Sequence, residues 1–134
     1  MPYQATDGHT CYWNKYVSVF FNKDMEDVPK DDNEEMVAAI DRQPISIAVA
    51  AEKFMHYSNG VFNDWSCGND LDHAILAVGY GESGNQKYYK VKNSWGASWG
   101  EGGYIRFERH TGKEVGICGL TSAASYPTGQ NPKP

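Results

Sequence analysis

The order of hydrophobic and polar positions predicts one amphipathic helix in the first half of the chain, over residues 33–42. Three hydrophobic residues recur there at helical intervals: Met36, Ala39 and Ile40. Asp32 precedes the segment and stands three residues before Glu35, which is a capping-box spacing. Pro44 is expected to stop the helix, because proline has no backbone N–H to continue it.

The chain after Pro44 has the pattern of short β-strands separated by glycine-rich turns. Strands are predicted at residues 45–49, 73–80, 87–92 and 103–108, and a further strand-like patch covers residues 16–21. Most of the 14 glycines lie between positions 79 and 119. This pattern predicts an α+β fold that is mainly β, an antiparallel barrel-like domain with one or two helices. Residues 1–127 are expected to form one domain, and residues 128–134 a flexible tail.

Composition excludes several classes of partner. The formal net charge is −5 and the 12 lysines and arginines are scattered, which argues against binding to nucleic acid or to an anionic membrane. No apolar stretch approaches the roughly 20 residues that a membrane-spanning helix needs. The first four residues, Met-Pro-Tyr-Gln, do not begin a signal peptide. No cofactor is expected.

A G-x-G-x-x-G pattern at residues 79–84 is interpreted as a chance match and not as a dinucleotide-binding site. The segment reads Gly-Tyr-Gly-Glu-Ser-Gly and follows a predicted strand, as a G-x-G-x-x-G motif would. A dinucleotide site requires a helix next, whereas residues 85–91 have the pattern of a strand. We therefore expect a hairpin turn there.

Two segments combine residue types that can carry chemistry. In residues 67–81, His73 begins an apolar strand, so its ring is expected at an edge of the sheet. In residues 92–104, Asn93 ends a strand and two tryptophans follow in a glycine-rich loop. Taken singly, a histidine is more often structural than catalytic, and an asparagine after a strand is more often a turn former.

Taken together, the two segments resemble the right-hand, carboxy-terminal domain of papain-like (cathepsin L-like) cysteine peptidases. The resemblance extends over nearly the whole chain, and motifs in this order and at this spacing are highly specific. The residues that carry it are 43–48, 71–74, 78–81, 92–96, 99–100, 116–120 and 124–127.

The resemblance implies thiol-dependent cleavage of peptide bonds by the parent enzyme. His73 would act as general base and acid, and Asn93 would orient its ring as the third member of such triads does. Trp95 would cover the contact between them, and Trp99 would line the cleft on the leaving-group side. Asp72 would support the site.

The resemblance also implies which residues form the specificity pocket. Its walls correspond to Ala48, Leu71, Ala74 and Ala123. All four are apolar, so we expect the pocket to prefer a hydrophobic substrate side chain such as leucine or phenylalanine over a basic one.

The three cysteines are explained by the same resemblance. From composition alone they are three buried thiols, or one disulfide and a leftover thiol. By resemblance Cys67 pairs with Cys118, and the family partner of Cys11 lies in the left-hand domain, so Cys11 is expected to be unpaired. A zinc site of Cys67, His73 and Cys118 is disfavoured, because the sequence has no close pair of ligands. No metal is expected.

The sequence has no Gln-x5-Cys-x-x-Cys-Trp motif, which in this family supplies the nucleophile and the oxyanion glutamine. The chain is therefore expected to be a truncated part of a longer peptidase and inactive alone. Its expected partners are the missing left-hand domain, the peptide substrates of the parent enzyme, and itself through the apolar face left exposed. By analogy the parent is secreted or lysosomal/vacuolar.

An alternative from another class is a non-catalytic binding module that recognises peptides, inhibitors or itself. The presence of both His73 and Asn93 weighs against a long-decayed enzyme, which would have no chemical need of the two residues.

Overall fold

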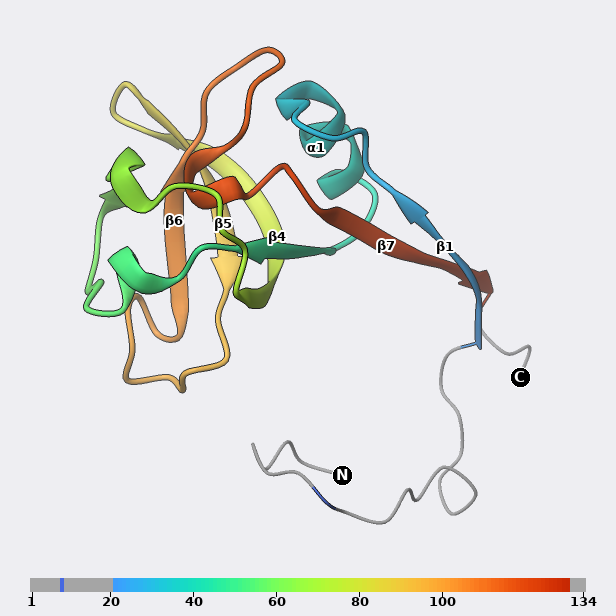
Figure 1. The fold of residues 1–134 in the computed structure, drawn as a ribbon, viewed down its shortest axis with the longest axis horizontal. Helices are drawn as coiled ribbons and strands as arrows, with labels where there is room; N and C mark the ends of the chain where they lie inside the picture. The colour runs from blue at the N-terminus through green and yellow to red at the C-terminus, as the bar shows by residue number, and fades with distance from the viewer. Residues whose placement is uncertain (1–7, 9–20, 131–134) are drawn as a thin grey trace.

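The fold is one curved β-sheet with a single α-helix against it, as far as the computed structural model describes the chain, which is residue 8 and residues 21–130 (Figure 1). This confirms the predicted fold class. The strands are β1 (Phe21–Asp27), β2 (Ile45–Val49), β3 (Val61–Phe62), β4 (His73–Ser83), β5 (Gln86–Lys92), β6 (Tyr104–Glu108) and β7 (Ala124–Gln130). The helix is α1 (Asn33–Ile40), and the 3-10 helices are η2 (Glu52–Phe54), η3 (Trp65–Cys67) and η4 (Ile117–Gly119).

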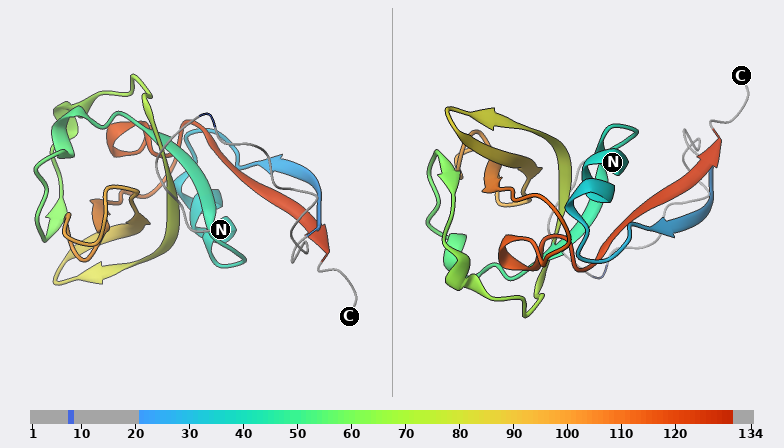
Figure 2. Two further views of the ribbon diagram at one scale, coloured as in Figure 1. Left: turned by 90° about the horizontal axis from the view of Figure 1, so that it is seen from below. Right: turned by 90° about the horizontal axis from the view of Figure 1, so that it is seen from above.

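The seven strands follow the order β1-β7-β2-β4-β5-β6-β3. Neighbours are antiparallel except for β3 and β6, which are parallel. In the described part of the chain the sheet curls but does not close, since β1 and β3 are its two edges. The β1–β7 ribbon extends away from the rest of the sheet, as the views in Figure 2 show.

Helix α1 begins as its sequence predicts and ends two residues early. The side chain of Asp32 accepts hydrogen bonds from the backbone N–H groups of Glu34 and Glu35, at 3.1 and 3.2 Å, which confirms the N-cap. At the other end the backbone N–H of Arg42 bonds to the Ala39 carbonyl, 3.1 Å away. This tighter i→i+3 bond closes the last turn before Pro44.

The predicted strands correspond closely to β2, β4, β5 and β6. The segment 45–49 matches β2, whereas β4 runs three residues beyond its predicted end to Ser83. Ser83 pairs with Gln86 of β5, so the G-x-G-x-x-G segment does lie at a hairpin. Most of the predicted patch at residues 16–21 lies outside the described residues. Strand β7 continues to Gln130 and so enters the range 128–134 that was predicted as a tail.

The core lies between the concave face of the sheet, α1 and the short 3-10 segments. The residues with the least exposure come from all of these elements: Met36, Ile45, Val49, Phe54, Tyr89, Val91, Ile105, Phe107, Ile117 and Leu120. Burying large apolar side chains is the main favourable term in folding. Among the described residues, no helix is long and apolar enough to span a membrane.

A disulfide between Cys67 and Cys118 joins η3 to η4 across 51 residues, which confirms the pairing expected from the resemblance. Closing a loop of this length restricts the unfolded chain, so replacing both cysteines with serine should lower the free energy of unfolding by about 2–5 kcal/mol. Urea unfolding without reductant measures this. Cys11→Ser is the control and should unfold like the unaltered chain, whereas equal losses in the two variants would contradict the prediction.

Candidate active site

The antiparallel pairing of β4 with β5 brings His73 and Asn93 together. Leu76 of β4 lies opposite Lys92, the last residue of β5. The start of β4 therefore meets the residue that comes directly after β5. The Nε2 atom of His73 lies 2.9 Å from the Oδ1 atom of Asn93, 20 residues away in sequence.

The backbone fixes how the Asn93 amide is oriented. Its Oδ1 atom accepts a second hydrogen bond from the Ser94 backbone N–H at 2.8 Å, and its own backbone N–H donates to the Gly103 carbonyl at 3.0 Å. An amide oxygen can only accept, so the Nε2 atom of His73 must carry the proton in their contact. In the neutral ring the Nδ1 atom is then the basic one.

Trp95 covers one face of the His73 ring. The two rings are stacked, with centroids 4.9 Å apart and planes at 22°. Asn93 is buried, while His73 is half-buried at the start of its strand. Covering the contact with an indole excludes water from it and strengthens the electrostatic interaction within it.

An aromatic shelf of Phe54, Tyr57, Trp95 and Trp99 supports this arrangement. Phe54 is fully buried and stacks against Trp95 with ring centroids 5.7 Å apart. Trp99 meets Trp95 edge to face at 5.1 Å, and its indole N–H donates to the Met55 carbonyl at 2.9 Å. Sequence reasoning found the two tryptophans but missed Phe54 and Tyr57, since nothing in residues 52–57 marks them as neighbours of the loop.

A polar network ties the shelf to the sheet. The Arg106 guanidinium donates to both carboxylate oxygens of Glu101, from Nε at 2.8 Å and Nη2 at 2.6 Å. Glu101 also accepts from the Gly60 backbone N–H at 2.9 Å, and the Tyr57 hydroxyl donates to the Gly60 carbonyl at 2.6 Å. The hydrogen bond from Arg106 lowers the pKa of Glu101, and burial raises the pKa of Tyr57.

Replacing Glu101 with glutamine should change how stability depends on pH. A carboxyl whose pKa is lowered by folding stabilises the protein above its unfolded value, about 4.5, and that contribution is lost as the pH falls through the lower folded value. The variant should be less stable at neutral pH by about 1–2 kcal/mol. It should then lose less stability than the unaltered chain in acid. Urea unfolding from neutral pH down to about pH 3 tests this, with exposed Glu52→Gln as control; parallel curves for the two proteins would contradict it.

The four predicted pocket residues are brought to one region. Ala48 of β2 lies opposite Ala74 of β4, and the Ala48 backbone N–H donates to the Ala123 carbonyl at 3.2 Å. Leu71 packs against η4, where a Cβ on Gly119 would lie only 2.5 Å from its Cδ2 atom. Glycine at position 119, with φ at +77°, is what permits this approach.

Asp72 holds the segment before His73 in place. Its Oδ1 atom accepts from the Ala51 backbone N–H at 2.9 Å, and its own N–H donates to the Val49 carbonyl at 3.1 Å. One partner ends β2 and the other lies just beyond it, so Asp72 ties the residue next to His73 to the neighbouring strand. Ala74, Asn93 and Ser94 line an open hollow of about 370 Å³.

The disulfide removes the chemistry on which the zinc alternative depended. Cys67 and Cys118 are bonded to each other, so neither can supply the thiolate that binds zinc. The described residues contain no group of three or more histidine, cysteine or acidic side chains arranged to hold a metal ion. Cys11 lies outside the described residues.

Comparison with known proteins agrees with the geometry. The family model for papain family cysteine proteases matches residues 1–128. The chain is 48% identical over 131 residues to cysteine protease XCP2 and 45% identical over 139 residues to the KDEL-tailed cysteine endopeptidase CEP2, both from Arabidopsis thaliana. These alignments cover 95% and 99% of this chain, but only 36% and 38% of the relatives, so the chain spans little more than a third of their length.

A solved structure shows the same fold. Bromelain protease from Ananas comosus, in complex with the E64 inhibitor, superposes with a TM-score of 0.88 at 44% sequence identity. The match covers 96% of this chain and 60% of the bromelain chain. From its site geometry, the family model and these relatives, the chain belongs to the papain family of cysteine proteases.

Proposed function

We propose that this chain supplies the histidine and asparagine of a papain-like thiol endopeptidase whose cysteine lies in a left-hand half. The observation that carries the proposal is the contact of His73 Nε2 with Asn93 Oδ1 at 2.9 Å, stacked under Trp95. This contact occupies one ring nitrogen and leaves the basic Nδ1 atom for a reacting group. A nucleophile and a positioned base are the two parts that covalent peptide cleavage requires.

In this mechanism the Nδ1 atom of His73 takes the proton of the cysteine thiol. The thiolate attacks the carbonyl carbon of the scissile bond, and the protonated His73 then gives the proton to the departing amine. In the second stage of the reaction, His73 takes a proton from water, and the water oxygen attacks the thioester. This step releases the acid, and the proton returns to the sulfur to give the thiol. Asn93 keeps the ring oriented through both proton transfers.

The pocket would take a hydrophobic side chain of the substrate. Ala48, Ala74 and Ala123 present small apolar groups close to the start of β4, and Leu71 adds a larger apolar wall. An arginine or lysine side chain would lose its hydration there and gain no carboxylate from these four residues. The pocket would therefore prefer a substrate side chain such as leucine or phenylalanine.

Turnover of fluorogenic peptides tests this function. We expect the purified chain to cleave none under reductant, because the residues it carries include neither the family's nucleophile motif nor its oxyanion glutamine. Fusion of the left-hand domain of a full-length plant relative to this chain should restore cleavage. The fusion should prefer leucine or phenylalanine over arginine in the pocket position.

Two outcomes would overturn parts of this proposal. Cleavage by the chain alone that survives repurification would mean another nucleophile, with Cys11 the first to replace. A fusion that folds and reacts with a thiol-directed inhibitor, yet prefers arginine, would refute the assigned pocket.

The expected partners derive from the same proposal. The left-hand half would dock beside His73, where Trp95 is 37% exposed. Without that half, the apolar surface beside the site would promote association of the chain with itself. Sedimentation at increasing concentration should show dimers or larger species, and the fusion should remain monomeric under the same conditions.

The parent enzyme would act along the secretory route or in a vacuole. The Cys67–Cys118 disulfide requires an oxidising compartment to form and persist. A fusion of the full-length parent to a fluorescent protein would test this, and a purely cytosolic signal would count against it.

A further inference from the structure

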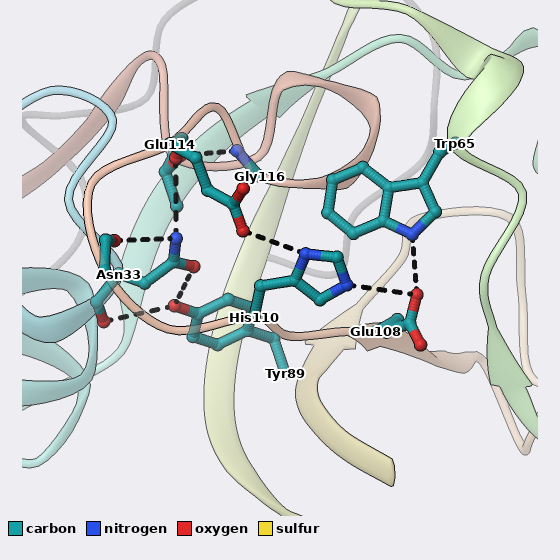
Figure 3. Close-up of polar contacts among 9 residues, drawn as sticks. Asn33, Trp65, Tyr89, Glu108, His110, Glu114 and Gly116 are labelled. Carbon is teal, nitrogen blue, oxygen red and sulfur yellow. Dashed lines mark hydrogen bonds and ion pairs between the residues drawn. The ribbon is translucent and has the colours of Figure 1, made fainter.

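A second histidine, His110, lies between two glutamates just after the end of β6, whereas His73 begins β4. Its Nδ1 atom is 2.9 Å from Oε1 of Glu114, and its Nε2 atom is 3.6 Å from Oε2 of Glu108 (Figure 3). Trp65 lies over the ring, with centroids 4.3 Å apart and planes at 26°, and its indole N–H donates to Glu108 at 2.6 Å. The proposed peptidase mechanism uses none of these four residues.

Three of the four side chains lie within residues 108–114, and Trp65 comes from a segment more than 40 residues earlier. Glu108 ends β6, His110 and Glu114 lie in the loop that leads to η4, and Trp65 begins η3. The carbonyl of Glu114 accepts from Asn33 of α1 at 3.4 Å and from the Thr121 hydroxyl at 3.2 Å, so the loop is fixed from its other side. Asn33 itself is held by the buried hydroxyl of Tyr89 at 2.9 Å (Figure 3). Contacts with His110 and Glu108 therefore join η3 to an anchored frame.

The contacts of His110 depend on its charge. A protonated imidazole donates from both nitrogens, so it can serve Glu108 and Glu114 at the same time, and its charge is favoured by the face of an indole. A neutral ring has one N–H. It can keep the bond to Glu114, but its other nitrogen then turns a lone pair toward Glu108. Histidine is the side chain that ordinarily changes charge between about pH 5 and 8.

We propose that Trp65, Glu108, His110 and Glu114 form a pH-responsive latch that holds η3 against the end of β6 more tightly in mild acid than at higher pH. The direction of the pH effect follows because the charged form of His110 is the one that gains hydrogen-bond partners. The latch is closed when His110 is protonated and both glutamates are ionised, and it loosens when His110 becomes neutral.

Several other charged groups lie near His110, and most of them have partners of their own. The Arg109 guanidinium lies over the rings of Tyr80 and Tyr89, at 5.4 and 5.7 Å. Asp64, the residue before η3, accepts from the hydroxyl and N–H of Ser66, which lowers its pKa. The charged groups that line the hollows beside His110 from α1 and β5 are Glu34 and Lys87. Lys113 pairs with Asp32 at 3.6 Å.

The latch would act on the segment that leads to the candidate site. Cys67 of η3 is bonded to Cys118 of η4, and Leu71 packs on the neighbouring Gly119. When the latch loosens, the segment from η3 to Leu71 is still held by the bond of Trp65 to Glu108, by the disulfide and by the packing of Leu71 on Gly119. The effect on the specificity pocket rests on the proposed function, whereas the latch itself does not.

Hydrogen exchange of the full chain at pH 6 and pH 8 tests the latch without any measurement of turnover. After correction for intrinsic exchange rates, amides in residues 65–71 should exchange about two- to fivefold faster at pH 8, the factor expected for an exposed ion pair. The indole N–H resonance of Trp65, assigned with Trp65→Phe, should move over the same pH range. His56→Gln alters an exposed histidine and should preserve both effects.

Two substitutions at position 110 separate the latch from a general pH effect. His110→Gln should exchange at the faster rate at both pH values, and His110→Arg, which keeps a charge, should exchange at the slower rate at both. The proposal is overturned if the unaltered chain shows no pH dependence in residues 65–71, or if His110→Gln retains it. Since peptide turnover is not measured, failure here leaves the proposed function standing, and failure of that function leaves the latch standing.

Discussion

Replacing His73 with alanine in the reconstituted enzyme should lower kcat/KM for a leucine-containing peptide by about 10³-fold or more. The loss removes both proton transfers, and positioned general acid–base catalysis typically contributes about 10²–10⁴-fold. The thiol also loses the partner that holds it as thiolate. Initial rates over a range of peptide concentrations measure the change, and we expect it to appear mainly in kcat.

The controls for this prediction lie on the same chain. His56→Ala alters an exposed histidine outside the site and should leave kcat/KM unchanged. Asn93→Ala removes the acceptor 2.9 Å from the ring but leaves the base, so its loss should fall between those of the other two variants. A His73→Ala enzyme that retained a tenth of the activity would show that another group transfers the proton.

Replacing Phe54 with alanine should lower the free energy of unfolding by about 3–5 kcal/mol, the range for truncating a buried aromatic residue. Phe54 is fully buried and contacts four aromatic rings: Phe62, Trp95, Trp99 and Phe107. Its loss leaves a cavity directly behind the indole that covers His73. Urea unfolding measures the stability.

The site should respond to the same change. With Phe54 absent, Trp95 loses the ring on which it stacks, so the His73 resonances should broaden or shift in the folded variant. Phe54→Leu is the matched control and should cost less because it fills most of the cavity. Equal stability of the alanine variant and the unaltered chain would mean that the shelf does not depend on Phe54.

Local features of the sequence predicted the elements well. Asp32 and Pro44 bracket a helix because one accepts the first free N–H groups and the other cannot donate. The alternation in residues 45–49 predicts β2 because one face of that strand is buried. A hairpin turn was predicted at residues 79–84, because the segment after it has the pattern of a strand and not of a helix; the hairpin is present, but β4 continues to Ser83 and the turn lies between Ser83 and Gln86.

The resemblance to papain-like peptidases predicted features that these local patterns do not. It predicted the Cys67–Cys118 pairing, which neither the cysteine count nor the spacing distinguishes from other arrangements. It also placed His73 and Asn93 in one site, although each alone has an ordinary structural explanation.

The sequence by itself determined the helix, most of the strands and, through its motifs, the family and the two polar residues that meet in the candidate site. Only the tertiary structure decided what surrounds them. Phe54 reaches Trp95, and Glu101 accepts from the Gly60 backbone N–H, because the strands curl and bring residues 52–62 against the loop after β5. The cluster around His110 also depends on a long-range contact, because Trp65 of η3 reaches residues 108–114. Such contacts depend on side chains distant in sequence, and local periodicity carries no information about them.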